Sequence, residues 1–119
     1  MTALTTGPIR KALPEGNRIN LDIINEDVSV PQTVFIRAFS LQPDGTRSPF
    51  VSEAFSILPG RFAARSYLVG FLPAVEFQID VSPSNDFSVT FTYLSSSNTI
   101  IRQIFRPELT EISALTPIS

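Results

Sequence analysis

The chain has 119 residues, of which 43 % are hydrophobic and 17 % are charged, so its length and composition are those of one globular domain. Nine lysines and arginines against eleven carboxylates give a formal net charge of −2, whereas a nucleic-acid-binding domain is expected to be basic. The sequence has no cysteine and no histidine, which excludes disulfides, thiolate ligands, a thiol nucleophile and the usual general base. We therefore expect a protein that is not an enzyme and that holds no metal or cofactor.

The first ten residues, MTALTTGPIR, lack the positive start and the apolar run of roughly 7–15 residues that mark a secretory signal. No stretch of the sequence approaches the ~18 apolar residues of a membrane span. We expect a protein that is made without a signal peptide, does not bind membranes and leaves the cell only by lysis or a dedicated route.

Apolar and polar residues alternate along almost the whole chain, with the two-residue period of half-buried β-strands. In chain order, this alternation predicts strands over residues 19–23, 34–39, 50–57, 61–69, 75–81, 87–93, 99–105 and 108–112. Proline cannot donate a hydrogen bond to a sheet, and six prolines fall between these segments: Pro31, Pro43, Pro59, Pro73, Pro83 and Pro107. The pattern predicts an all-β, jelly-roll-like antiparallel β-sandwich of about eight strands. The segment after Pro107 would also suit one helical turn.

The most regular alternation lies in residues 75–81, where valine, phenylalanine and isoleucine side chains face one way and Glu76, Gln78 and Asp80 face the other. We expect the apolar face to lie in the core and the polar face to be exposed to water. Over the whole chain, the residues predicted to be buried are Ile19, Leu21, Ile23, Val34, Ile36, Val75, Phe77, Ile79, Phe87, Val89 and Phe91.

Residues 1–17 contain two glycines and two prolines, so we expect them to form an extended arm before a sandwich domain over 18–113 and a C-terminal tail over 114–119. Three basic residues and one acidic residue give 1–18 a charge of +2, while four basic and eight acidic residues give 19–100 a charge of −4. The arm could close over its own sandwich or fill a groove on a neighbouring subunit, and this charge complementarity would help encounter between subunits. The predicted interface residues of the arm are Leu4, Ile9, Arg10, Lys11 and Leu13. Deletion of the arm is then expected to leave a folded sandwich that no longer assembles.

Few side chains of this sequence could take part in catalysis or metal binding. Glu76 and Asp80 share a strand face but stand about 13 Å apart at ~3.3 Å per residue, too far for the usual pair of glycosidase carboxylates. The acidic cluster at 25–27 lacks the spacing of a calcium loop, so we interpret it as a polar turn. A hydroxyl nucleophile would need a base, and Lys11 is the sole lysine.

Basic and aromatic residues come closest together at Arg61, Phe62, Arg65 and Tyr67, but the acidic body of the chain favours surface arginines over a nucleic-acid site. A carbohydrate-binding face on Tyr67 or Tyr93 is a further hypothesis that no other residue supports.

Strand 34–39 places Phe35, Arg37 and Phe39 on the face opposite its aliphatic side chains. If the aliphatic face lies in the core, these three residues form an outward aromatic patch, which is typical of a partner surface. The excess of arginine over lysine, eight to one, is also typical of protein interfaces. The alternative is that the sandwich buries both faces of this strand.

Five stretches carry a resemblance that spans residues 19–112: Ile19–Asn25, Thr33–Phe39, Ile57–Gly60, Val75–Val81 and Arg106–Thr110. Their order resembles small cysteine-poor jelly-roll proteins of spore-forming Bacillota and, more distantly, the endospore-appendage pilins of Bacillus. In those pilins a flexible N-terminal connector engages preceding subunits, and strands add to the sheets of neighbours. The matching connector would be residues 1–17, although the cysteines that cross-link the pilins are absent from it.

We therefore expect a structural subunit that assembles with itself into a fibre, outside the cell or on a spore surface, by β-augmentation and arm docking. Its partners would be copies of itself and a spore-surface or cell-surface anchor protein. The alternative is a carbohydrate- or protein-binding β-sandwich module, for example a phage structural or receptor-binding component, and an acyl or glycosyl hydrolase is a more distant third.

Overall fold

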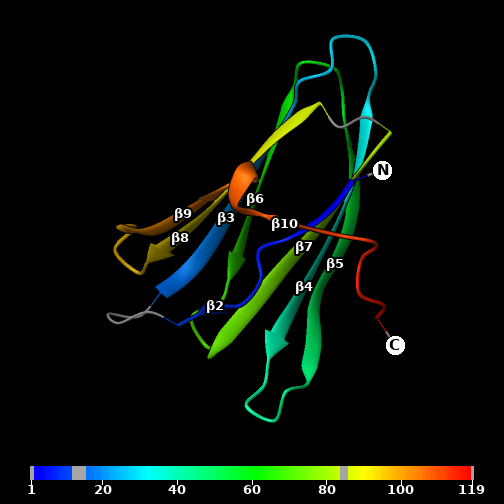
Figure 1. The fold of residues 1–119 in the computed structure, drawn as a ribbon. Helices are drawn as coiled ribbons and strands as arrows, with labels where there is room; N and C mark the ends of the chain where they lie inside the picture. The colour runs from blue at the N-terminus through cyan, green and yellow to red at the C-terminus, as the bar shows by residue number, and fades with distance from the viewer. Residues whose placement is uncertain (1, 12–15, 84–85, 119) are drawn as a thin grey trace.

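The computed structural model describes residues 2–11, 16–83 and 86–118, which form two antiparallel β-sheets packed face to face (Figure 1). The strands are β1 Thr2–Thr5, β2 Ile9–Arg10, β3 Gly16–Asn25, β4 Gln32–Leu41, β5 Arg47–Ile57, β6 Phe62–Leu68, β7 Ala74–Ser82, β8 Phe87–Ser95, β9 Ile100–Phe105 and β10 Thr110–Ile112. A 3-10 helix, η1 Arg106–Glu108, joins β9 to β10. The predicted all-β antiparallel sandwich is confirmed, with ten strands among the described residues in place of about eight.

The strands divide into two sheets. Sheet A has the order β10-β1-β7-β4-β5, with β2 also pairing with β7, and sheet B has the order β6-β3-β8-β9. Every pairing is antiparallel. Among the described strands from β3 onward, only β4–β5 and β8–β9 are hairpins, because every other step along the chain moves to the opposite sheet. The β4–β5 turn uses Gly45 at φ +90°, a conformation that glycine adopts without steric cost.

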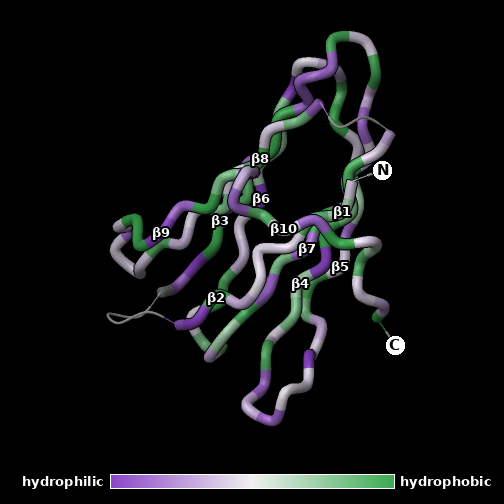
Figure 2. Tube along the Cα trace, viewed as in Figure 1, coloured by the Kyte–Doolittle hydropathy of each residue, from purple (hydrophilic) through white to green (hydrophobic). Residues whose placement is uncertain are grey.

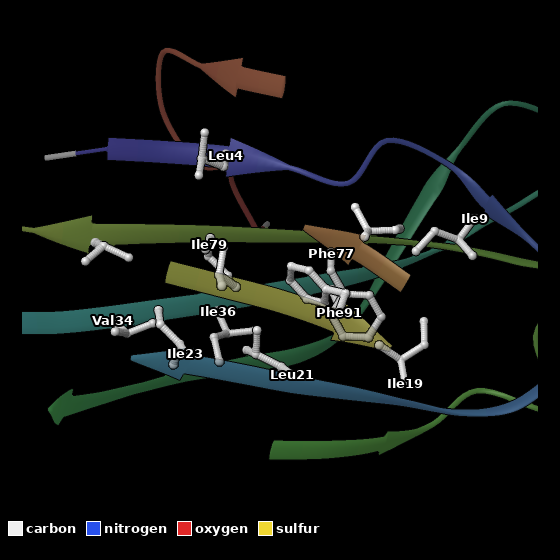
Figure 3. Close-up of a cluster of buried hydrophobic side chains, with 14 of the residues drawn as sticks. Leu4, Ile9, Ile19, Leu21, Ile23, Val34, Ile36, Phe77, Ile79 and Phe91 are labelled. Carbon is white, nitrogen blue, oxygen red and sulfur yellow. The ribbon is translucent and has the colours of Figure 1, made fainter. Parts of the chain in front are cut away.

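The core lies between the sheets, where all eleven residues predicted to be buried are buried. The aromatic rings of Phe77 on β7 and Phe91 on β8 meet across the two sheets, with ring centroids 5.6 Å apart (Figure 3). Tyr67 on β6 packs against the same Phe77 ring at 5.3 Å. Phe77 thus joins one strand of sheet A to two strands of sheet B.

The N-terminal segment is part of this sandwich, so the predicted boundary at residue 18 is wrong. Strand β1 lies between β7 and β10 in sheet A, and β2 continues along β7. Leu4 and Ile9, which were predicted to contact a neighbouring subunit, are buried in the core of their own chain. A four-residue strand followed by Gly7 and Pro8 is too short for alternation to reveal, and only its pairing with β7 fixes it as a strand.

The remaining predicted arm residues are less deeply placed. Arg10 is exposed at the end of β2, and the backbone N–H of Lys11 donates to the carbonyl of Pro73 at 2.9 Å. Leu13 lies outside the described residues. The arm therefore does not form the predicted connector over residues 2–11, because main-chain hydrogen bonds and burial tie that part to β7.

Truncation of Phe77 to alanine is expected to cost about 3–5 kcal/mol of unfolding free energy, because it removes contacts to both Tyr67 and Phe91. The matched control is Phe71→Ala on an exposed ring, which should change stability by less than about 0.5 kcal/mol. Chemical denaturation measures both values. Equal effects at the two positions would contradict the placement of the core.

Truncation of Leu4 to alanine is expected to cost about 2–5 kcal/mol, because Leu4 belongs to the core in which β1 pairs with β7. Leu68→Ala, at an exposed leucine on β6, serves as the control. Thermal and urea unfolding would measure both. A negligible loss for Leu4→Ala would mean that the arm is not part of its own core and would restore the connector hypothesis.

Candidate functional site

The described residues contain no cluster of three or more carboxylates that could hold a metal ion, and no helix of theirs is long and apolar enough to cross a membrane. Glu76 and Asp80 were expected on an exposed polar face, but both are buried, as is Gln78 between them. The expectation is wrong because other segments of the chain cover this face of β7. The outer face of sheet A, with its buried polar side chains, is therefore a candidate functional site.

Glu76 lies at the centre of this outer face with both carboxylate oxygens engaged. Thr5 Oγ1, on β1, donates to Glu76 Oε2, and Gln78 Nε2 donates to the same oxygen at 3.1 Å. Arg47 Nε, on β5, is 3.1 Å from Glu76 Oε1. These three donors tie β1 and β5 to β7, which gives Glu76 a structural role in sheet A.

The C-terminal tail covers this cluster through Thr116. Gln78 Oε1 accepts from the Thr116 backbone N–H at 2.8 Å, and Gln78 Nε2 donates to the Thr116 hydroxyl at 2.9 Å. Arg37 Nη1 donates to the Thr116 carbonyl at 2.8 Å, and Arg47 Nη1 donates to its hydroxyl at 3.2 Å. One tail residue thus satisfies side chains from three strands, and the predicted tail is docked on sheet A.

The predicted outward aromatic patch is wrong for two of its three residues. Phe39 is buried, with the Arg47 guanidinium 6.0 Å from its ring centroid, and Arg37 is bonded to Thr116. Phe35 remains 44 % exposed. The alternation placed all three on one face correctly, but the tail and Arg47 cover most of that face.

Asp80 is the exception within this polar face. Among the residues that the structure describes, none hydrogen-bonds to Asp80 Oδ1, although that oxygen is buried. Burial raises the pKa of the Asp80 carboxyl above its ordinary value, because the charged form loses hydration and the attraction of the N-terminal ammonium offsets this only in part. Asp80 therefore costs the folded state stability when it is ionised.

Replacement of Asp80 by asparagine is expected to raise the melting temperature at neutral pH. Because the folded pKa lies above the unfolded one, the cost of ionised Asp80 is full at neutral pH and disappears once both states are protonated. The advantage of Asp80→Asn should therefore shrink as the pH falls towards about 3. The control, Asp44→Asn, should have the opposite sign, because hydrogen bonds from Thr46 lower the pKa of Asp44. An advantage independent of pH would contradict this account.

Sheet edges β5 and β6 face each other and are joined by side chains. Tyr67 Oη donates to Glu53 Oε1 at 2.6 Å, and Arg65 Nε lies 3.3 Å from the same oxygen. The Arg65 guanidinium also stacks 4.1 Å from the centroid of Phe55. Burial and the Glu53 carboxylate raise the pKa of the Tyr67 hydroxyl above its ordinary value. Tyr67 and Arg65 therefore close the side of the sandwich and do not share a surface with Phe62, which is exposed on the outer face of sheet B.

Asn25 organises the loops at one end of the sandwich, where a polar turn was predicted at 25–27. Its Nδ2 donates to the carbonyls of Val30 and Ile57, each at 2.9 Å. Its Oδ1 accepts from the backbone of Asp27 and from Gln32 Nε2. These bonds use the amide within the protein and give the cluster a structural role.

Strand β9 forms the other edge of sheet B and is strongly apolar. Ile100 is 56 % exposed and Phe105 is 48 % exposed, and Ile101 is exposed between them. Figure 2 shows this hydrophobic stretch at the start of β9, at the outer end of the β8–β9 hairpin. The sequence analysis predicted the strand but did not single out its edge position, which depends on the order of strands in the sheet.

No family model matches the chain, and no curated protein matches it. Among solved structures, the chain is similar to that described as "Crystal Structure of Thermotoga maritima 1070", with a TM-score of 0.54 and 10 % sequence identity, over 87 % of this chain and 89 % of that one. At this identity the likeness shows that the two proteins share the β-sandwich fold.

Proposed function

We propose that the protein is a structural subunit that assembles with copies of itself, with the β9 edge of one copy adding to the β6 edge of the next. The observation that carries the proposal is the apolar character of β9. An edge strand presents unpaired backbone groups, and exposed isoleucine and phenylalanine side chains beside those groups favour pairing with another strand. Proline is absent from β9, so each of its residues keeps a backbone N–H.

The edges of sheet A are less suited to pairing. Strand β5 contains Pro49, has a register shift opposite Ala38 and Phe39, and turns Glu53 towards the core side, where it bonds to Tyr67. These are devices that keep an edge strand from pairing. Strand β10 has three residues, which offers few hydrogen bonds to a partner. Sheet B has similar features, since β9 has a register shift opposite Tyr93 and Leu94, and Arg65 Nη1 on β6 donates to the Ala64 carbonyl at 2.9 Å. Its edge strands β6 and β9 nevertheless contain no proline and are longer than β10, so sheet B supports the proposal better than sheet A.

Strand direction supports the same choice. The four strands of sheet B alternate in direction, so β6 and β9 run opposite to each other. A second copy in the same orientation would then bring its β6 antiparallel to β9 and continue the sheet. The path of sheet A has five strands, so its edge strands β10 and β5 run in the same direction. A second copy placed beside sheet A in the same orientation would therefore pair β10 with β5 in parallel. Parallel pairing is slightly less stable per residue.

The outward side chains of the two edges also suit each other. Register relations across sheet B align Ile100 with Leu94, Arg18 and Leu68, so Ile100 would lie beside the exposed Leu68 of the next copy. Such apolar cross-strand pairs stabilise a sheet by about 0.2–1 kcal/mol each. Because the two surfaces differ, each copy leaves one edge open, and growth continues without closure.

This mode of assembly replaces arm docking, since residues 2–11 are tied to their own sheet. The resemblance to endospore-appendage pilins adds the prediction that the polymer is a fibre at a spore surface. An anchor protein would then hold one end of it.

The proposal predicts that Ile100→Lys and Leu68→Lys each abolish assembly, because a lysine on an edge strand resists pairing. Light scattering after size-exclusion chromatography, over a wide concentration range, should show growing mass for the wild type and a monomer for each variant. Val28→Lys, at an exposed loop residue away from both edges, is the control and should assemble like the wild type.

Mixing the two variants gives a sharper result. Ile100→Lys retains a working β6 edge and Leu68→Lys a working β9 edge, so the mixture should form heterodimers and grow no further. Thermal unfolding confirms that each variant is folded. A wild type that stays monomeric at every concentration would contradict the proposal. So would polymers in either single variant.

A further inference from the structure

A hollow of about 250 Å³ lies on the outer face of sheet B, which is not covered by the tail. Its residues come from neighbouring strands: Arg18, Asn20, Asp22, Ala64, Arg65 and Ser66. Strand β6 explains the hollow, because its outward positions are taken in turn by Phe62, Ala64, Ser66 and Leu68. Two small side chains, Ala64 and Ser66, thus line the hollow, while the larger Phe62 and Leu68 lie beyond it along the same face of β6.

Polar groups line one side of the hollow. Arg18, Asn20 and Asp22 occupy successive outward positions of β3, so their Cα atoms are about 6.6 Å apart. Among the described residues, none hydrogen-bonds or ion-pairs with the side chains of Arg18 or Asp22. Ser66 Oγ donates to Asn20 Oδ1 at 2.8 Å, which leaves the Asn20 amide hydrogens to face solvent. The hollow thus offers a cation, an amide donor and a carboxylate in a row.

We propose that this hollow binds a neutral carbohydrate, one sugar ring at a time. The Asp22 carboxylate accepts hydrogen bonds from adjacent hydroxyls, while Asn20 and Arg18 donate to the next hydroxyl or ring oxygen. Phe62 is 71 % exposed and lies next to the hollow, diagonally beside Asp22 on the same sheet face, so a sugar ring that extends past Asp22 would meet the Phe62 ring with its C–H face. The hollow is smaller than the ~300–1,000 Å³ of pockets for drug-sized ligands, and it suits a single ring.

The other ligand classes fit less well. An anion such as a phosphate would meet the Asp22 carboxylate inside the hollow, and of the two arginines that line it Arg65 already pairs with Glu53 at 3.3 Å. A nucleic acid would also meet a chain of net charge −2. A divalent cation would find one carboxylate where it needs several oxygen ligands. An apolar ligand would cover Asp22 and Arg18 without satisfying them. A neutral polyol meets both the donors and the acceptors.

This site goes beyond the proposed function and does not depend on it. Pairing between β9 and β6 uses backbone groups at the edges of sheet B, whereas the hollow opens on the face of the sheet. A polymer would repeat the hollow along its length and so raise the avidity for a polysaccharide surface.

The test is a titration of ¹⁵N-labelled protein followed by NMR, with cellohexaose, maltohexaose, chitohexaose, mannohexaose and xylohexaose as probes. The Ile100→Lys variant is used beside the wild type, so that binding is measured apart from assembly. At least one sugar should shift the amide signals of Asn20, Asp22, Ala64 and Ser66, with a dissociation constant of about 1 mM or tighter.

Two substitutions assign the binding to the hollow. Asp22→Asn and Phe62→Ala should each weaken binding about tenfold or more, since they remove the carboxylate acceptor and the ring. Asp44→Asn, in the β4–β5 turn, and Phe71→Ala are the matched controls and should leave affinity unchanged. The proposal is overturned if none of the five sugars shifts these signals at about 10 mM, if the shifts map elsewhere, or if Asp22→Asn binds like the wild type.

Discussion

Strand β7 is buried on both faces, and much of the rest of the structure supplies it with packing contacts and hydrogen-bond partners. Its inward side chains fill the core around Phe77. Its outward side chains are polar, and a buried polar group is costly unless it is hydrogen-bonded. Glu76 and Gln78 find partners on β1, on β5 and in the tail, so three segments distant in sequence converge on one strand. Asp80, with one oxygen unpartnered among the described residues, marks where this arrangement is incomplete.

The sequence predicted the seven longer strands, β3 to β9, and the short β10, and all eleven residues that it placed in the core are buried. Both results follow from local alternation and from proline positions. The sequence did not predict that the polar face of β7 is covered. Alternation shows which side chains share a face, but whether water or another segment meets that face depends on tertiary structure. Thr116 gives no local signal of its role, since its four hydrogen bonds reach residues 38 to 79 positions away.

The same reasoning explains the error at the N-terminus. Residues 2–5 are too few to establish a period, and the glycines and prolines after them favour an extended arm. Only the pairing of β1 between β7 and β10 makes the segment a strand. The sequence gives a clearer signal for the hollow on sheet B, since the small residues Ala64 and Ser66 lie between Phe62 and Leu68 on one face of the strand. Its polar side required the register of β6 against β3, which no local pattern supplies.

The two outer faces of the sandwich therefore differ in a way that bears on function. The N-terminal segment is a strand of sheet A and the C-terminal tail covers its outer face, which removes the arm as a connector and leaves the edges of sheet B as the route to assembly. Sheet B is open, and its face carries the unpaired polar groups that the carbohydrate proposal uses. The choice of the sheet B edges as the route to assembly depends on the ends being part of, or docked on, their own sheet A.

Native-state hydrogen exchange at Thr6 tests this dependence most directly. The Thr6 backbone N–H donates to the carbonyl of Phe77 at 2.9 Å, so its protection reports whether the N-terminal segment stays bound to β7. In dilute protein, below the concentration of any assembly, Thr6 should exchange at least as slowly as most β7 amides. Rapid exchange at Thr6 beside protected β7 amides would mean that the segment is free in the monomer, and would contradict the account.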